Sequence, residues 1–265
     1  KDPNMVSDIH SAYFEAGATI ATTNSYTILR DRLKHFALEH EVHNLWNSSV
    51  AAACKARDKF GSGRIAGSIG PLVASYRPDI CPPVEEASSI YKEKVESIAP
   101  MVDILLVETV CSLKQAEGVL AATDNSNKPV WISFSVDDND GTKLRSGENL
   151  EDVKAVINNH FVEAVLINCS PPEVVGNALS ILSKMGLAFG AYANGFSKIS
   201  SDFLKTRPTV DALTARKDLG PEEYSNFVTN WIRNGASIVG GCCEIGPTHI
   251  SKIAQKIHEL GYKTL

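Results

Sequence analysis

The sequence predicts an α/β protein, and among α/β folds it favours a (β/α)8 TIM barrel. Short apolar runs rich in β-branched residues recur along the chain, and longer amphipathic segments separate them. Apolar strands that alternate with helices are typical of a parallel sheet with right-handed crossovers. No G-x-G-x-x-G motif follows the early runs, which disfavours the competing open sheet that binds dinucleotides.

Seven segments have the length and composition of buried parallel strands. In chain order they are Thr19–Thr23, Arg64–Ser68, Asp103–Val107, Pro129–Ser135, Ala164–Asn168, Ala188–Tyr192 and Ser237–Gly240. The segments between them predict helices, for example Val84–Ile98, Leu113–Thr123, Leu150–Asn158 and Pro221–Asn234. The last of these begins with proline followed by two glutamates, and both residue types favour the first turn of a helix.

Seven strands are one fewer than a closed barrel requires. The chain begins at Lys1 without a methionine, so we expect that the first strand of the barrel is missing from this sequence. No linker, low-complexity run or composition change divides the chain. We therefore predict a single barrel domain over residues 1–265.

The composition is typical of a globular protein with a large hydrophobic core, and it disfavours some classes of binding partner. The net charge of −5, with no basic stripe, argues against nucleic acid or an anionic membrane as partner. The longest apolar stretches, such as Ile104–Val107, are too short to cross a bilayer. The polar start of the chain does not resemble a secretory signal. The six cysteines lack the regular spacing of a disulfide framework, so we expect a reducing, cytoplasmic location.

Three cysteines follow predicted strands at the end where barrel enzymes carry their active sites. Cys169 follows the fifth predicted strand, and Cys242 with Cys243 follows the seventh. Two adjacent cysteines can reach one centre only if the backbone turns, and Gly240–Gly241 would supply that freedom. Three thiolates suit zinc, because they are soft anionic ligands that leave a fourth position for substrate. The alternatives are three buried inert cysteines or a Cys242–Cys243 disulfide.

Eight short motifs occur along the chain in a characteristic order. They are Glu15-Ala16-Gly17-Ala18, Thr22-Thr23-Asn24-Ser25-Tyr26, Ala66-Gly67-Ser68-Ile69-Gly70-Pro71, Val107-Glu108-Thr109, Trp131-Ile132-Ser133-Phe134-Ser135, Ile167-Asn168-Cys169-Ser170-Pro171-Pro172, Ala191-Tyr192-Ala193-Asn194-Gly195 and Ile238-Val239-Gly240-Gly241-Cys242-Cys243 followed by Pro247-Thr248-His249-Ile250. In this order they resemble the homocysteine S-methyltransferase family, the zinc-dependent thiol methyltransferases that include the betaine–homocysteine enzymes. The resemblance covers essentially the whole chain.

The resemblance implies a role for each candidate residue. Cys169, Cys242 and Cys243 would be the zinc ligands and the catalytic centre. Glu108 matches the acid that binds the amino-acid end of homocysteine. Asn194 matches a family asparagine close to the metal, and Asn24 and Asn168 are predicted with it to bind substrate.

The resemblance also implies a reaction, the transfer of a methyl group to homocysteine to give methionine. S-methylmethionine and S-adenosylmethionine are the expected donors, because betaine-using relatives carry a C-terminal extension and folate-dependent relatives carry cobalamin domains. The sequence departs from the family in three places. An initial Asp-Gly-Gly strand is absent, Glu244-Ile245-Gly246 replaces the frequent Gly-Thr, and Gly195-Phe196 replaces the frequent Ala-Gly. The last two departures concern the substrate rim rather than the metal.

Three other functions are compatible with parts of the pattern. A zinc-dependent barrel hydrolase or deaminase would usually need histidine or aspartate ligands, and no His-x-His motif occurs. A redox or metal-storage protein would use Cys242 and Cys243 as a thiol pair. A family member that has lost its activity would carry Glu244 as the disabling residue.

Overall fold

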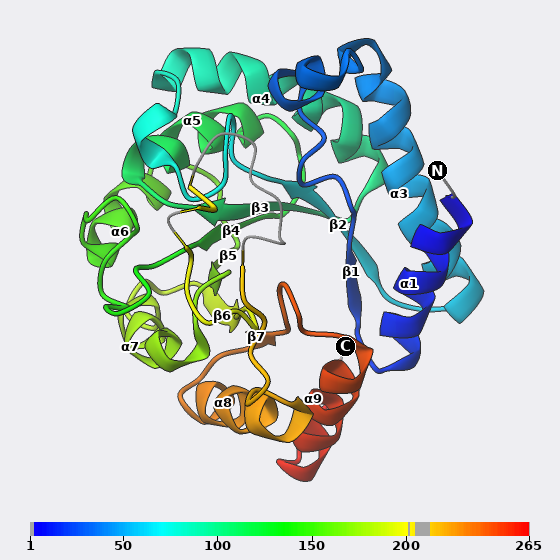
Figure 1. The fold of residues 1–265 in the computed structure, drawn as a ribbon, viewed down its shortest axis with the longest axis vertical. Helices are drawn as coiled ribbons and strands as arrows, with labels where there is room; N and C mark the ends of the chain where they lie inside the picture. Colours follow the sequence, from blue (N-terminus) through cyan, green and yellow to red (C-terminus); the bar gives the residue numbers. More distant parts are fainter. Residues whose placement is uncertain (1–2, 201, 205–212, 265) are drawn as a thin grey trace.

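A computed structural model describes residues 3–200, 202–204 and 213–264, and they form an α/β fold around one parallel sheet (Figure 1). The strands are β1 (Ile20–Thr22), β2 (Arg64–Ile69), β3 (Ile104–Val110), β4 (Val130–Phe134), β5 (Ala164–Asn168), β6 (Ala188–Tyr192) and β7 (Ile238–Val239). They lie in sequence order, and each pairs in parallel with the next. The predicted parallel order is therefore confirmed.

Helices cover the outside of this sheet. The α-helices are α1 (Pro3–Glu15), α2 (Arg30–Leu33), α3 (Val42–Phe60), α4 (Val84–Ile98), α5 (Leu113–Thr123), α6 (Val153–Ile157), α7 (Pro172–Leu182), α8 (Pro221–Arg233) and α9 (Pro247–Glu259). Local sequence sets several of their ends. The Ser112 hydroxyl caps α5 by accepting from the Gln115 amide at 3.2 Å, and Gly61 ends α3 in the left-handed region at φ 93°. None of the helices in the described ranges is both long and apolar enough to cross a membrane.

The sheet curls into a half-barrel that is open between its first and last strands (Figure 1). Among the described residues no strand joins β7 to β1, as expected from a prediction of seven strands. Most predicted elements agree within one or two residues at each end, and three differ in extent or in type. Strand β3 runs to Val110 rather than Val107. The segment Leu150–Asn158 is a 3-10 turn followed by the short α6, and the last strand keeps only Ile238 and Val239.

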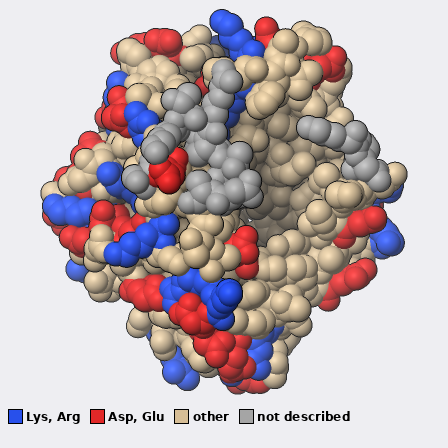
Figure 2. Space-filling model, in the orientation of Figure 1, with Lys and Arg blue, Asp and Glu red and all other residues tan. Residues whose placement is uncertain are grey.

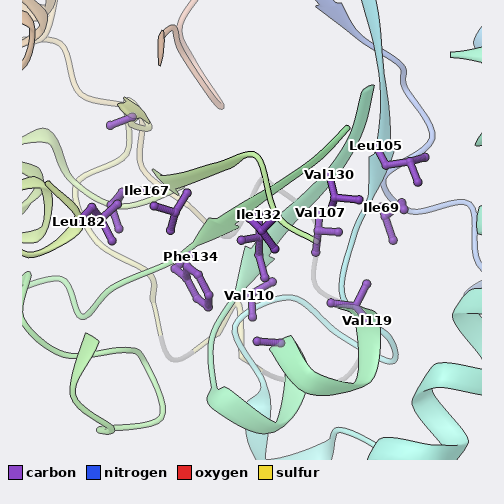
Figure 3. Packing of buried hydrophobic residues seen from close by; sticks show 14 of the residues in the cluster. Ile69, Leu105, Val107, Val110, Val119, Val130, Ile132, Phe134, Ile167 and Leu182 are labelled. Atoms are coloured by element: carbon purple, nitrogen blue, oxygen red, sulfur yellow. The ribbon is translucent and has the colours of Figure 1, made fainter. Parts of the chain in front are cut away.

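Successive side chains of each strand point to opposite faces of the sheet, so the hydrophobic core has two parts. Outward-facing side chains form the larger cluster against the helices, and Figure 3 shows Val107 and Val110 beside Ile132 and Phe134 in that cluster, near Val119 of α5. Inward-facing side chains fill the barrel. They are Ala66, Ile104, Leu106, Trp131, Ala164 and Leu166. Beyond this apolar layer, the carboxyl ends of the strands carry the polar side chains described next.

Candidate metal and substrate site

Cys169, Cys242 and Cys243 converge at the carboxyl ends of the strands. Cys169 directly follows β5, and the other two follow β7 after two glycines. Their three sulfur atoms all lie within 4.8 Å of one another. The sulfurs of Cys242 and Cys243 are 3.9 Å apart, and those of Cys169 and Cys242 lie in disulfide contact, with their Cα atoms 5.9 Å apart. The structure thus brings together all three predicted ligands.

The backbone at Cys169 turns the sulfur toward the other two. Cys169 adopts φ 49°, in the left-handed region that non-glycine residues rarely occupy. Its carbonyl accepts from the Ser135 hydroxyl at 3.3 Å and from the Arg145 guanidinium at 3.4 Å. Arg145 is itself held by an ion pair with Asp138, and both side chains are only 10% exposed. This network stabilises an otherwise unfavourable conformation at one of the three predicted ligands.

The cysteine pair is held against the loop that follows β6. The Cys242 amide donates to the Ala193 carbonyl at 2.9 Å, and the Gly195 amide donates to the Cys243 carbonyl at 2.8 Å. The expectation that Gly240 and Gly241 supply the conformational freedom of this turn is wrong, because neither has a positive φ. Gly241 is needed because a Cβ there would lie 2.0 Å from the Ile245 side chain. The left-handed residue of this turn is Glu244, at φ 66°.

The donor set fits a soft divalent cation such as zinc. Three sulfurs at mutual distances within 4.8 Å can surround one ion with a fourth position left over. Desolvation raises the pKa of the Cys243 thiol, and the negative charges of Glu108 and Glu244 raise it further. A bound cation would reverse this effect, because thiols lose their proton when they coordinate a metal.

Glu108 of β3 is held inside the barrel by two hydroxyl groups from other strands. It is 8% exposed. Its two carboxylate oxygens accept from Ser68 of β2 at 2.5 Å and from Tyr192 of β6 at 3.2 Å. Burial raises the pKa of Glu108, whereas these hydrogen bonds and the positive charge of Lys94 lower it in part. A buried carboxylate that retains acceptor capacity is suited to bind an ammonium group.

A fully buried lysine lies behind Glu108. The Lys94 ammonium, on α4, donates to the Ser25 carbonyl at 2.6 Å. The Ser25 hydroxyl donates to the Ser68 carbonyl at 2.8 Å, so a chain of hydrogen bonds connects α4 to the residue that holds Glu108. Burial lowers the pKa of Lys94 to about 7. The burial of Lys94 could not be predicted from the sequence, because a lysine in an amphipathic helix usually faces solvent.

The three predicted asparagines occupy different environments. Asn24 is exposed just after β1. Asn194 is buried, and its side-chain oxygen accepts from the Phe196 amide at 3.1 Å in a local turn. Asn168, at the end of β5, is fully buried, and both ends of its amide bind Thr109. Sequence reasoning missed Ser68 and Tyr192, although both stand in strand-end motifs.

Comparison with known proteins assigns the chain to a family. A model of the family described as homocysteine S-methyltransferase matches residues 1–257. The chain belongs to the homocysteine S-methyltransferase family.

Curated relatives within this family cover nearly all of the chain. Homocysteine S-methyltransferase 1 of Brassica oleracea is 28% identical over 97% of this chain and 84% of its own length. Homocysteine S-methyltransferase YbgG of Bacillus subtilis is 27% identical over 96% of this chain and 84% of its own length. A selenocysteine methyltransferase of Astragalus bisulcatus is 28% identical over 95% of this chain and 82% of its length. Similar proteins are therefore named for methyl transfer to sulfur or selenium amino acids.

Solved structures support the fold. The metallated form of the homocysteine methyltransferase MmuM from Escherichia coli superimposes with a TM-score of 0.81 at 25% identity, over 97% of this chain and 85% of that one. The oxidised form of MmuM gives the same values. A metallated neighbour agrees with a cysteine triad that could hold a metal ion.

Proposed function

We propose that this protein is an active homocysteine S-methyltransferase, which moves a methyl group from a sulfonium donor to the thiol of L-homocysteine and forms methionine. S-methylmethionine and S-adenosylmethionine are the proposed donors. The observation that carries the proposal is the convergence of three cysteine sulfurs within 4.8 Å in a member of this family. The metal that we propose for this site is zinc.

Zinc held by Cys169, Cys242 and Cys243 would supply a positive centre that lowers the pKa of an incoming thiol. Such help is needed because a free thiol is mostly protonated at neutral pH and is then a weak nucleophile. The homocysteine proton leaves to solvent. The new S–CH3 bond forms as the donor's S–CH3 bond breaks, and its electron pair stays on the donor sulfur, which becomes a neutral thioether.

The chain's own residues contribute orientation and charge. Glu108 would accept the homocysteine ammonium, while Ser68 and Tyr192 keep its carboxylate in place. Asn24 is exposed just after β1, at the carboxyl end of that strand, and is a candidate for contact with substrate. Three cysteine thiolates around one divalent cation carry a net negative charge, which favours a cationic sulfonium donor over a neutral one. Figure 2 shows a hollow on one face of the molecule that is walled largely by uncharged residues, with charged side chains mainly toward the periphery.

A redox function is the second candidate, and one observation favours it. The sulfurs of Cys169 and Cys242 lie in disulfide contact. The thiol pair considered from the sequence was Cys242 with Cys243, whereas these two sulfurs are 3.9 Å apart. A disulfide between Cys169 and Cys242 would remove two of the three proposed metal ligands. A reducing cytoplasm would keep the cysteines as thiols, so methyl transfer remains the function proposed for that compartment.

The decisive experiment is a methyl-transfer assay with homocysteine and each sulfonium donor. The protein would be reconstituted with zinc under a non-thiol reductant, and methionine would be measured. We expect methionine with at least one donor, loss of activity in Cys243→Ser, and full activity in the control Cys54→Ser, which changes a cysteine of α3 outside the triad. Full activity in Cys243→Ser, or no methionine from either donor, would contradict the proposal.

A further inference from the structure

The end of strand β3 contains an irregularity beside Glu108. Val107 pairs with Ile132 and Val110 pairs with Phe134, so two residues of β3 stand opposite one residue of β4. This is the arrangement of a β-bulge. Its second residue, Thr109, has φ 60° and is fully buried. A β-branched residue in the left-handed region is unfavourable unless its surroundings hold it there.

Asn168 of β5, two strands away from β3, holds Thr109 in this conformation. Its side-chain oxygen accepts from the Thr109 amide at 3.0 Å, and its side-chain nitrogen donates to the Thr109 hydroxyl at 2.9 Å. Both residues are fully buried. The Thr109 amide has left the regular β3–β4 pairing at the bulge, so Asn168 provides the partner that a buried N–H group needs. The two bonds fix both the backbone and the side chain of the bulge residue.

The bulge determines where Glu108 stands. Glu108 is the residue directly before Thr109, and it faces Ser68 and Tyr192 inside the barrel. The bulge also returns Val110 to the outward core beside Phe134. If Thr109 relaxed to an extended conformation, strand alternation would turn Val110 inward and shift the segment that carries Glu108.

We infer that Asn168 is a positioning residue for Glu108, which acts by clamping the Thr109 bulge rather than by contacting homocysteine. Asn168 also directly precedes Cys169, so one residue joins the strand that offers a metal ligand to the strand that offers the ammonium acceptor. The inference rests on the proposed function, because its readout is homocysteine binding.

The test is a double-mutant cycle on homocysteine affinity, measured calorimetrically with zinc-loaded protein. We expect Asn168→Ala to weaken binding by about tenfold or more, which corresponds to about 1.4 kcal/mol. In a Glu108→Gln background the same change should have little further effect, because the two residues act through one contact. Asn158→Ala, which changes an exposed asparagine at the end of α6, should bind as the wild type does.

A rescue variant distinguishes a specific effect of Asn168 on the Thr109 bulge from a general loss of stability. Glycine adopts positive φ readily, so Thr109→Gly added to Asn168→Ala should restore most of the lost affinity. If Asn168→Ala does not fold, Thr109→Val provides a parallel cycle, in which the amide bond to Asn168 stays and the hydroxyl contacts with Asn168 and Tyr26 are removed. Equal losses in both Glu108 backgrounds, or no loss in Asn168→Ala, would overturn the inference. Failure of wild-type protein to bind homocysteine would instead overturn the proposed function.

Discussion

Replacing Glu108 by glutamine tests the substrate site with little change in shape. The side chain is buried, and its two oxygens accept from Ser68 and Tyr192. Because hydroxyl groups can donate or accept, both partners can adapt to an amide. The substitution removes the negative charge that would bind the homocysteine ammonium. A hydrogen bond to a charged group contributes about 1.5–3 kcal/mol, so we expect homocysteine to bind about 10- to 150-fold more weakly.

Calorimetric titration of zinc-loaded protein with L-homocysteine would measure this effect, with Glu163→Gln as an exposed control. The pH dependence gives a second check. Burial raises the pKa of Glu108 above its usual value. Wild-type affinity should therefore increase as pH rises through that raised pKa, because only the ionised carboxylate attracts the ammonium group. Glu108→Gln should lack this component. An unchanged dissociation constant in Glu108→Gln would refute the assigned role, whatever the zinc content.

Two further predictions concern the buried Lys94 and the packing around two glycines. The pKa of Lys94 is lowered from 10.5 to about 7, so the folded protein releases a proton that the unfolded chain keeps between these values. Stability should therefore fall as pH decreases from 10.5 to about 7, and Lys94→Met should remove up to about 5 kcal/mol of this pH dependence, measured by urea unfolding between pH 6 and 11. An identical pH dependence in the variant would contradict the lowered pKa of Lys94. Gly190→Ala should destabilise the fold by about 3 kcal/mol or more, because its Cβ would lie 1.7 Å from the Ile238 carbonyl. Gly176→Ala, in open space on α7, should stabilise the fold by about 0.5–1 kcal/mol. Equal melting temperatures for the two glycine variants would contradict both expectations.

The strands and the grouping of the three cysteines could be predicted from the sequence, because the strand pattern is local and the strand order is simple. Ala164–Asn168 and Ala188–Tyr192 were predicted with their observed bounds, since a parallel strand buried on both faces is apolar throughout. The convergence of Cys169 with Cys242 followed from one topological rule, that parallel strands end on the same side of a barrel.

The remaining features depend on contacts between distant segments. The bulge at Thr109 adds one residue to a strand and leaves no compositional mark. Lys94 is buried where α4 meets the loop after β1, and it donates a hydrogen bond to that loop. Asn168 was predicted to bind substrate, and only the structure shows its amide engaged with Thr109. The roles of these three residues depend on which distant segments pack together, and sequence motifs alone do not reveal those contacts.

The zinc content of the protein would show whether the three cysteines form a metal centre. Wild-type protein and Cys54→Ser would be purified without chelator, reconstituted anaerobically with reductant and zinc, and analysed for metal beside Cys169→Ser, Cys242→Ser and Cys243→Ser. We expect about one zinc per chain in the first two proteins and little in the three triad variants. Zinc absent from the wild type, or retained equally by the triad variants, would contradict a thiolate metal centre at this site.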